Sequence, residues 1–372
     1  MRRILLTLTA ILLTSSLFAQ DKHFDELFKD GTLRIDYTFM GNATEQYVAL
    51  REMSYTDNWY GRRINLNDVP LKGNGDLTLT DSVSGEVIYK TSFSSLFQEW
   101  ITTPEALELS KSFEFTLLVP MPHKKSVATL VLRDNTGKES IHKYTINPED
   151  VLIRDRSNQK PLPYKYIHKG GDSKEAIDVV ILAEGYTAEQ MDIFLNDAII
   201  TKKEILSYQP FSSHSEKFNF IAVMSPSIDS NVSVPQALDW RDTAVSSNFM
   251  TFYMARYLTS GNVYDMYDLV TNIPCEHFII LANTNTYGGG GIYNSYTLTT
   301  AHHKDFRPVV VHEFGHSFAG LGDEYFYDNA DDNDNMHSLK HEPWEPNITT
   351  LVDFESKWAD MMPEGIEVPT TV

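Results

Sequence analysis

Residues 176–190 read AIDVVILAEGYTAEQ and indicate the architecture of the second half of the chain. Ala176 to Ala183 are almost continuously apolar, as in a strand that is buried on both faces of a parallel sheet. Thr187 and Gln190 have the spacing of a capping box, in which each side chain satisfies a backbone amide of a helical first turn. We expect that helix to run to about Tyr208. A buried strand that leads into a capped helix is typical of an α/β domain.

The sequence further along repeats this alternation. Phe218 to Met224 and Glu276 to Ala282 (EHFIILA) are two more apolar strands, and we expect a helix between them at about Ser247 to Leu258. Cys275 is the only cysteine, so the chain forms no internal disulfide. Its place just before an apolar strand favours a buried thiol over a catalytic nucleophile.

The sequence before residue 150 has a different pattern. Short stretches rich in β-branched, aromatic and aliphatic residues alternate with turn-formers such as Lys72-Gly73-Asn74-Gly75, and helical periodicity is almost absent. We expect strands at residues 32–39, 76–80, 86–89, 112–119 and 126–132. Regular alternation of strands and turns is typical of a β-sandwich.

The length of 372 residues favours two domains, and the 42% of hydrophobic residues excludes a wholly disordered chain. We expect an N-terminal β-sandwich at residues 21–157 and a C-terminal α/β domain at residues 175–372. A linker should join them at residues 158–174, where Lys160-Pro161-Leu162-Pro163 and Gly170-Gly171 lie.

Residues 1–20 have the organisation of a secretory signal peptide. Arg2 and Arg3 precede a mostly apolar run from Ile4 to Phe18, and a cleavage zone follows at Ala19. The alternative is an uncleaved membrane anchor, for which the run is short. No cysteine follows it that could carry a lipid. We therefore expect an exported protein, periplasmic or secreted, with no transmembrane segment in the mature chain.

The formal net charge of −20 argues against nucleic acid and anionic membranes as partners. The most acidic stretch is the loop Asp328 to Asn335 (DNADDNDN). An EF-hand needs oxygen ligands at alternating positions, and Met336 takes the fifth position when counting starts at Asp332. We therefore do not favour calcium at Asp328 to Asn335, although an irregular, weak calcium site is the alternative there.

The chemistry is carried by Val309 to Ala319 (VVVHEFGHSFA), which follows a proline suited to the first turn of a helix. On a helix, His312 and His316 lie one turn apart on one face, so their imidazoles can bind a single cation. Glu313 is rotated from His312 by about a hundred degrees, which places it beside the open position of a zinc site. There it can accept a proton from zinc-bound water.

A catalytic zinc site has three protein ligands, so a third must follow. Gly320-Leu321-Gly322 should end the helix and reverse the chain. Asp323 is the predicted third ligand because a short carboxylate suits a tight return. Glu324 is the alternative ligand, or else an outer partner that orients a ligand histidine. Four other histidines are near in sequence, and we interpret each as an exposed loop residue: His302, His303, His337 and His341.

The stretch HEFGHSFAGLGDEY at residues 312–325 resembles the signature of the bacterial IgA-peptidase family of zinc metallopeptidases, an HExxH followed by Gly and Asp-Glu-Tyr. The resemblance extends to residues 180–187 (VILAEGYT) and 287–291 (YGGGG), and it is strong from about Asp178 onward. It implies a peptidase that binds zinc through two histidines and an aspartate and uses a glutamate as base. By position, these are His312, His316, Asp323 and Glu313.

The family is similar to the metzincins, whose pattern is HExxHxxGxxH. Here the Gly and the third ligand each fall one residue later, and Asp replaces His. A metzincin-like fold also has a methionine turn beneath the metal, for which Met361 and Met362 are the candidates after Met336. The resemblance implies a catalytic domain that is incomplete at Val372.

The predicted function is therefore zinc-dependent hydrolysis of peptide bonds in a protein or peptide, with Glu313 as general base and then acid. Tyr325 is a candidate for holding the oxyanion, and an ordinary packing tyrosine is the alternative. Residues 276–293 are a candidate rim along which an extended substrate pairs, and a mobile surface loop is the alternative. The competing hypothesis is a non-catalytic surface-binding protein with a structural zinc, in which Glu313 would have no purpose.

Overall fold

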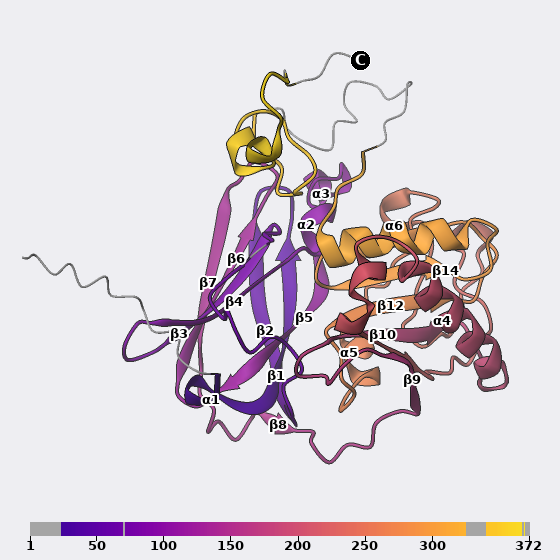
Figure 1. The fold of residues 1–372 in the computed structure, drawn as a ribbon, viewed down its shortest axis with the longest axis horizontal. Coiled ribbons are helices and arrows are strands. Elements are labelled where there is room, and N and C mark those ends of the chain that lie inside the picture. Colours follow the sequence, from indigo (N-terminus) through magenta and orange to yellow (C-terminus); the bar gives the residue numbers. More distant parts are fainter. Residues whose placement is uncertain (1–23, 70, 325–339, 367, 369–372) are drawn as a thin grey trace, which may run out of the picture.

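The computed structural model describes residues 24–69, 71–324, 340–366 and 368. The expected signal peptide at residues 1–20, Tyr325, and the acidic loop Asp328 to Asn335 lie outside the described residues. The protein is rich in sheets and has few helices, and its N-terminal and C-terminal parts lie side by side (Figure 1). Among the described residues, no helix has the length and apolar character needed to cross a membrane.

The N-terminal part consists of two four-stranded sheets, with strand orders β5-β1-β2-β8 and β4-β3-β6-β7. All neighbouring strands are antiparallel except β2 and β8. The strands are β1 Phe28–Gly41, β2 Gln46–Asp57, β3 Gly75–Asp81, β4 Val87–Phe93, β5 Lys111–Pro122, β6 Ser126–Arg133, β7 Glu139–Ile146 and β8 Arg154–Asp155. Three short helices accompany them: α1 Phe24–Leu27, α2 Leu96–Trp100 and α3 Glu105–Glu108.

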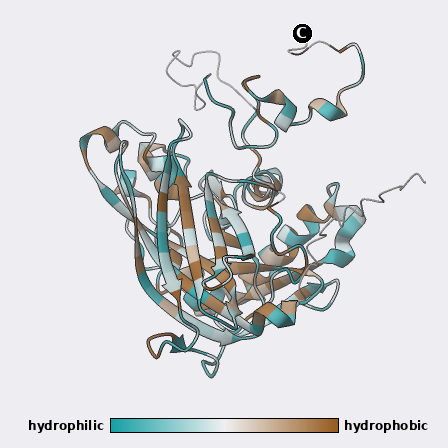
Figure 2. Cartoon of the chain, turned by 90° about the vertical axis from the view of Figure 1, so that its left-hand side faces the viewer, coloured by the Kyte–Doolittle hydropathy of each residue, from teal (hydrophilic) through white to brown (hydrophobic). Residues whose placement is uncertain are grey.

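The core of this part lies between the two sheets. Leu33, Ile35, Tyr37 and Phe39 alternate along β1 and are fully buried, in one cluster with residues of β3, β4, β5 and β6. Apolar and polar residues alternate along these strands (Figure 2). The five expected strands are present, whereas β2 and β7 were missed because both are largely exposed and rich in charged residues.

The C-terminal part is built on one six-stranded sheet with the order β13-β14-β12-β10-β11-β9. The four central strands are parallel, and the two edge strands are antiparallel to their neighbours. The strands are β9 Tyr164–Lys169, β10 Ile177–Glu184, β11 Phe218–Val223, β12 His277–Ala282, β13 Gly289–Ile292 and β14 Tyr296–Thr300. Helices α4 (Met191–Ile205) and α6 (Phe306–Ala319) cover one face, and α5 (Val263–Leu269) packs on the other.

The expected capping box forms: the side chains of Thr187 and Gln190 bond to each other's backbone, and a short 3-10 turn continues into α4. The helix expected at Ser247 to Leu258 is wrong. That stretch is a loop with left-handed backbone at Met250, Phe252 and Tyr253, and the helix of this region is α5. The expected linker at residues 158–174 is wrong in its second half, because β9 is a strand of the C-terminal sheet. Its partly exposed, polar residues gave no apolar run to recognise.

The two parts meet through a polar seam on the outer face of β1. Arg34 is buried there and bonds to Asp36, to Asp268 and to the backbone oxygen of Tyr264. The Tyr264 hydroxyl in turn donates to the backbone oxygen of Tyr37 at 2.6 Å. Beside this seam, a cavity of about 480 Å³ lies between the parts, and its lining includes Glu276 and His277 of the C-terminal part.

Candidate active site

Helix α6 presents the HExxH motif. It runs from Phe306 to Ala319 and is capped by Gly320, whose φ of 62° is a left-handed conformation that glycine adopts without strain. Val310 and Phe314 of this helix are fully buried on the sheet. The two histidines lie on a more accessible face, with side-chain exposures of 44% for His312 and 17% for His316.

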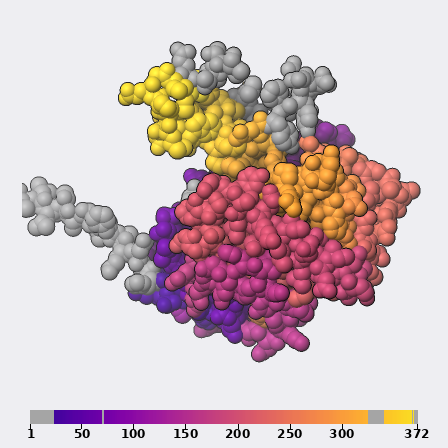
Figure 3. Space-filling model, turned by 45° about the vertical axis from the view of Figure 1, so that its right-hand side comes forward, coloured from indigo at the N-terminus to yellow at the C-terminus, as the bar shows by residue number. Residues whose placement is uncertain are grey.

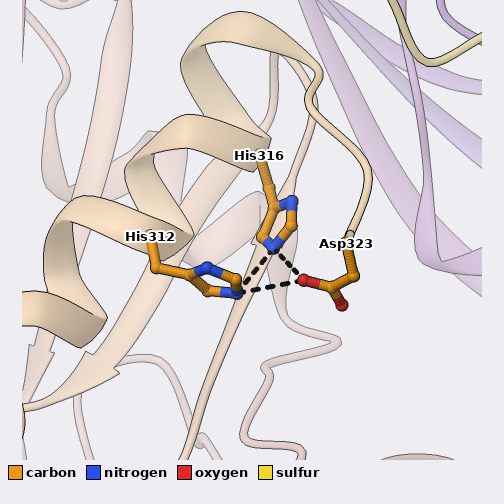
Figure 4. A group of neighbouring side chains, drawn as sticks. All are labelled: His312, His316 and Asp323. Atoms are coloured by element: carbon orange, nitrogen blue, oxygen red, sulfur yellow. Dashed lines mark hydrogen bonds and ion pairs between the residues drawn. The ribbon is translucent and has the colours of Figure 1, made fainter. Parts of the chain in front are cut away.

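The chain reverses after Gly320 and brings Asp323 back to the two histidines (Figure 4). Its Oδ1 lies 3.1 Å from Nε2 of His312 and 3.2 Å from Nε2 of His316. The two Nε2 atoms are 3.0 Å apart. Three donor atoms thus form a nearly equilateral triangle, and these three residues are the only potential metal-binding group found among the described residues.

The triangle has the size that a tetrahedral zinc ion requires. Zinc lies about 2.0–2.1 Å from nitrogen and oxygen ligands, so two ligand atoms at the tetrahedral angle are about 3.3 Å apart. The observed edges of 3.0, 3.1 and 3.2 Å are close to that value. Two imidazoles and a carboxylate are also a donor set that zinc uses in catalytic sites. The residues present therefore fit a zinc ion.

His316 is held in the orientation that such a site needs. Its Nδ1 bonds to the backbone oxygen of Leu321, which can only accept, so Nδ1 carries a proton and Nε2 is the ring atom directed toward Asp323. Burial lowers the pKa of His316, but the hydrogen bonds to Asp323 and Leu321 outweigh burial and raise it to about 9. The same group of contacts thus favours a positive charge at the centre of the triangle.

Glu313 lies beside the triangle and outside it. Its carboxylate packs against strand β13, where a β-carbon on Gly289 would come within 2.7 Å of the Glu313 Oε1. Burial raises the pKa of Glu313 to about 7, although the positive charge of His316 and His312 opposes this shift. A carboxyl group with a pKa near neutrality can both accept and return a proton.

The glycines of β13 let helix α6 approach the strand. A β-carbon on Gly291 would meet the backbone oxygen of Glu313 at 2.3 Å and the His316 β-carbon at 2.8 Å. On the other face of the strand, a β-carbon on Gly290 would meet the Tyr257 ring at 2.7 Å. A side chain at Gly290 would push the opposite wall away from the strand, and one at Gly291 would push α6 away.

The expected substrate rim along residues 276–293 is occupied at one point of strand β13, because the chain itself pairs with the outer edge of the strand at Gly289. Gly289 donates to the backbone oxygen of Arg256 and accepts from the amide of Leu258, both at 3.3 Å. Tyr293 exchanges hydrogen bonds with Ser94 of the N-terminal part, both at 3.0 Å. The chain itself therefore occupies the outer edge at Gly289 and the backbone at Tyr293, just after the strand.

Among the described residues, the others singled out in the sequence do not belong to the triangle. Glu324 is not part of the triangle; its Oε1 accepts a hydrogen bond from Asn347 at 2.8 Å. His302 was expected to be an exposed loop residue, but it is half-buried and its Nε2 bonds to Asp197 at 2.8 Å. His341 is exposed and His337 lies outside the described residues. Met361 is 75% exposed, so it does not pack beneath the histidines.

Sequence reasoning missed Glu184, which organises the loop that leads into the stretch expected to be a helix. Its buried carboxylate accepts four hydrogen bonds of 2.6–2.9 Å, from the Thr243 hydroxyl, the Val245 amide, and both the amide and hydroxyl of Ser247. A charged residue at the end of a mostly apolar strand was the available signal, because a buried carboxylate must be satisfied by donors from elsewhere.

It also missed Glu99 of α2, which the N-terminal part contributes near the site. The Tyr257 hydroxyl donates to Glu99 Oε2 at 2.6 Å. Burial raises the pKa of Glu99 to about 7. Tyr257 packs on strand β13, whose other face lies against Glu313. By binding Tyr257, Glu99 of the N-terminal part therefore supports one wall of the candidate site.

Comparison with known protein families matches both parts of the chain. Residues 23–144 match the family described as the Peptidase M64 N-terminus, and residues 166–372 match the family described as IgA Peptidase M64. A search of the curated proteins gives no match. The second region contains more than half of the chain and includes all residues of the triangle. Members of this family are typically metal-dependent. The chain therefore belongs to the IgA peptidase M64 family and is a peptidase.

Proposed function

We propose that this chain is an exported, zinc-dependent endopeptidase in which His312, His316 and Asp323 hold the metal and Glu313 is the catalytic base. The observation that carries the proposal is the triangle of two imidazole nitrogens and one carboxylate oxygen with edges of 3.0–3.2 Å. Glu313 stands next to this triangle without belonging to it, as the role of a base requires.

A zinc ion at this position would polarise the scissile carbonyl and acidify a water molecule. Glu313 would accept the proton of the attacking water and deliver it to the nitrogen of the leaving amine. Gly289 and Gly291 leave the room that keeps Glu313 close to the histidines. The bond from His316 to the backbone oxygen of Leu321 holds the ring so that Nε2 remains directed at the site.

The competing function, a binding protein with a structural zinc, agrees less well with the site. Structural zinc sites are closed by four protein ligands, whereas catalytic sites have three and an open position. The described residues supply three, and His312 is accessible to solvent. Solvent or a substrate can therefore reach the ligand atoms.

The C-terminal part is metzincin-like in carrying its motif on a helix followed by a glycine turn and a third ligand. Export is supported by the charged start, the apolar run and the small-residue cleavage zone of residues 1–20. The substrate of this chain is a protein or peptide, in agreement with the family.

The test is metal analysis combined with proteolysis by the purified full-length protein. We expect one zinc ion per chain, lost in His316→Ala. Glu313→Gln should keep the zinc and the fold but lose cleavage of a mixed peptide library. Full zinc retention in His316→Ala would refute the site, and loss of zinc in Glu313→Gln would refute the role of Glu313 as a base.

A further inference from the structure

Residues 340–366 fold back onto the turn that carries Asp323, and we refer to them as the C-terminal strap. Figure 3 shows the strap in yellow against the orange segment that contains α6. Trp344 of the strap packs on Tyr293, with ring centroids 5.6 Å apart. A β-carbon on Gly320 would come within 3.1 Å of the Trp344 ring, so the strap lies directly on the end of the helix.

Asn347 of the strap makes three hydrogen bonds to this turn. Its Oδ1 accepts from the amide of Gly322 at 2.8 Å, and its Nδ2 donates to the backbone oxygen of Gly322 at 2.8 Å. The same Nδ2 donates to Glu324 Oε1 at 2.8 Å. The side-chain amide therefore satisfies both backbone groups of the residue before Asp323 and binds the side chain of the residue after it.

The backbone at Gly322 allows this close approach. A β-carbon there would lie 2.9 Å from Ile348 and 3.2 Å from Glu345, both in the strap. Two of the three residues between the helix and Asp323 are glycines, Gly320 and Gly322. Glycine loses more conformational freedom on ordering than any other residue, so this turn needs outside contacts to keep one conformation.

We propose that Asn347 is a positioning residue that holds Asp323 at the metal. Asp323 reaches both histidines only from one conformation of the turn, and the residues on either side of it are tied to a single side chain. With Asn347 in place, the turn is already ordered before metal binds, so binding has less entropy to lose. The inference rests on the proposed function, since it takes Asp323 to be a ligand.

The first test compares two asparagine variants of the full-length protein. Asn347→Ala should weaken zinc binding by about 10- to 100-fold, as for other partners of ligand residues, measured by competition with a chromophoric chelator. Asn272→Ala is the matched control. The Nδ2 of Asn272 also makes three hydrogen bonds, to the backbone oxygens of Arg156, Ser157 and Gln159 in the seam between the two parts. Asn272→Ala should lower the melting temperature but leave zinc affinity unchanged.

A second test asks for rescue, and it remains informative if Asn347→Ala does not fold. In Asn347→Asp, a carboxylate faces the Gly322 oxygen and the Glu324 carboxylate, so zinc affinity should fall. Adding Glu324→Gln supplies an amide donor to the new carboxylate and should restore part of that affinity. The visible spectrum of the cobalt-substituted protein should change in Asn347→Asp and move back toward that of the wild type in the double variant.

The outcomes separate this inference from the proposed function. If Asn347→Ala binds zinc as tightly as the wild type, or if Asn272→Ala weakens binding equally, the positioning role is overturned. Absence of rescue in the double variant would also overturn it. When His316→Ala loses zinc and the Asn347 variants keep it, only the inference fails. If His316→Ala retains zinc, both the proposed zinc site and the positioning role of Asn347 are refuted.

Discussion

The imidazole of His316 hydrogen bonds through Nδ1 to the backbone oxygen of Leu321, five residues further along the chain. This bond joins the helix that carries the histidines to the turn that follows it. As a result, the turn closes on the same side of the helix as the Nε2 atoms, and Asp323 rather than Glu324 meets them. The bond to Leu321 thus fixes both the ring and the path of the chain.

The first prediction distinguishes the two carboxylates after the turn. Asp323→Ala should lower zinc affinity far more than Glu324→Ala, whose loss should be about 10- to 100-fold because it removes only a partner of Asn347. Isothermal titration of the metal-free proteins with zinc measures both. Equal losses, or a larger loss in Glu324→Ala, would show that Glu324 is the ligand.

A methyl group at Gly289 of strand β13 should lower the catalytic rate more than it lowers stability. In Gly289→Ala, the new β-carbon would contact the end of the Glu313 side chain, which is flexible and can move away. Displacing a base by about 1 Å costs on the order of 100-fold in rate, so kcat should fall by about that factor with zinc retained. Gly261→Ala is the control, because a β-carbon there has open space around it. Unchanged kcat in Gly289→Ala would contradict the position of Glu313.

Glu184 should be a major source of stability in the C-terminal part. Glu184→Gln keeps the shape of the side chain but replaces one carboxylate oxygen by an NH2 group. That group faces an N–H or O–H donor that the carboxylate binds in the wild type, so a hydrogen bond is lost. We expect a loss of about 1.5–3 kcal/mol in the free energy of unfolding, the usual value of a hydrogen bond to a charged group. Glu189→Gln, at an exposed carboxylate that accepts from Thr187, should change stability by less than about 0.5 kcal/mol. Denaturant titration that finds the two variants equal would exclude this role.

Stability should fall as pH rises, because of Glu276 in the cavity between the parts. Burial raises the pKa of Glu276 to about 8 and that of its neighbour Asp178 to about 6. The folded state therefore holds protons that the unfolded state releases, and unfolding becomes easier as pH rises through the window between the unfolded and folded pKa values. Above about pH 6 the effect of Asp178 is complete, and Glu276 shares the remaining slope up to about pH 8 with Glu99, Glu313 and His316, whose pKa values are also raised. Glu276→Gln should flatten that slope in thermal melts, and a slope equal to that of the wild type would disprove the assignment.

Local sequence determined the parts of the molecule that depend on near neighbours. The i and i+4 spacing of His312 and His316 places them on one face of any helix, and the glycine at position 320 ends that helix. The apolar run of β10 and the capping box at Thr187 and Gln190 likewise predicted their own strand and helix. In each case the signal and the structure lie within a few residues of each other.

Tertiary structure decided what depends on segments far apart in the sequence. Glu184 holds residues 243–247 in a loop through four hydrogen bonds, two of them to Ser247, where the expected helix would have begun. Arg256 and Leu258 pair with the edge of β13 at Gly289, and Ser94 pairs with Tyr293 just after the strand; the local sequence indicated neither contact. Local patterning predicts how a segment folds. Local patterning does not predict which hydrogen-bonding groups of a segment stay free. That depends on the distant segments that pack against it and pair with those groups.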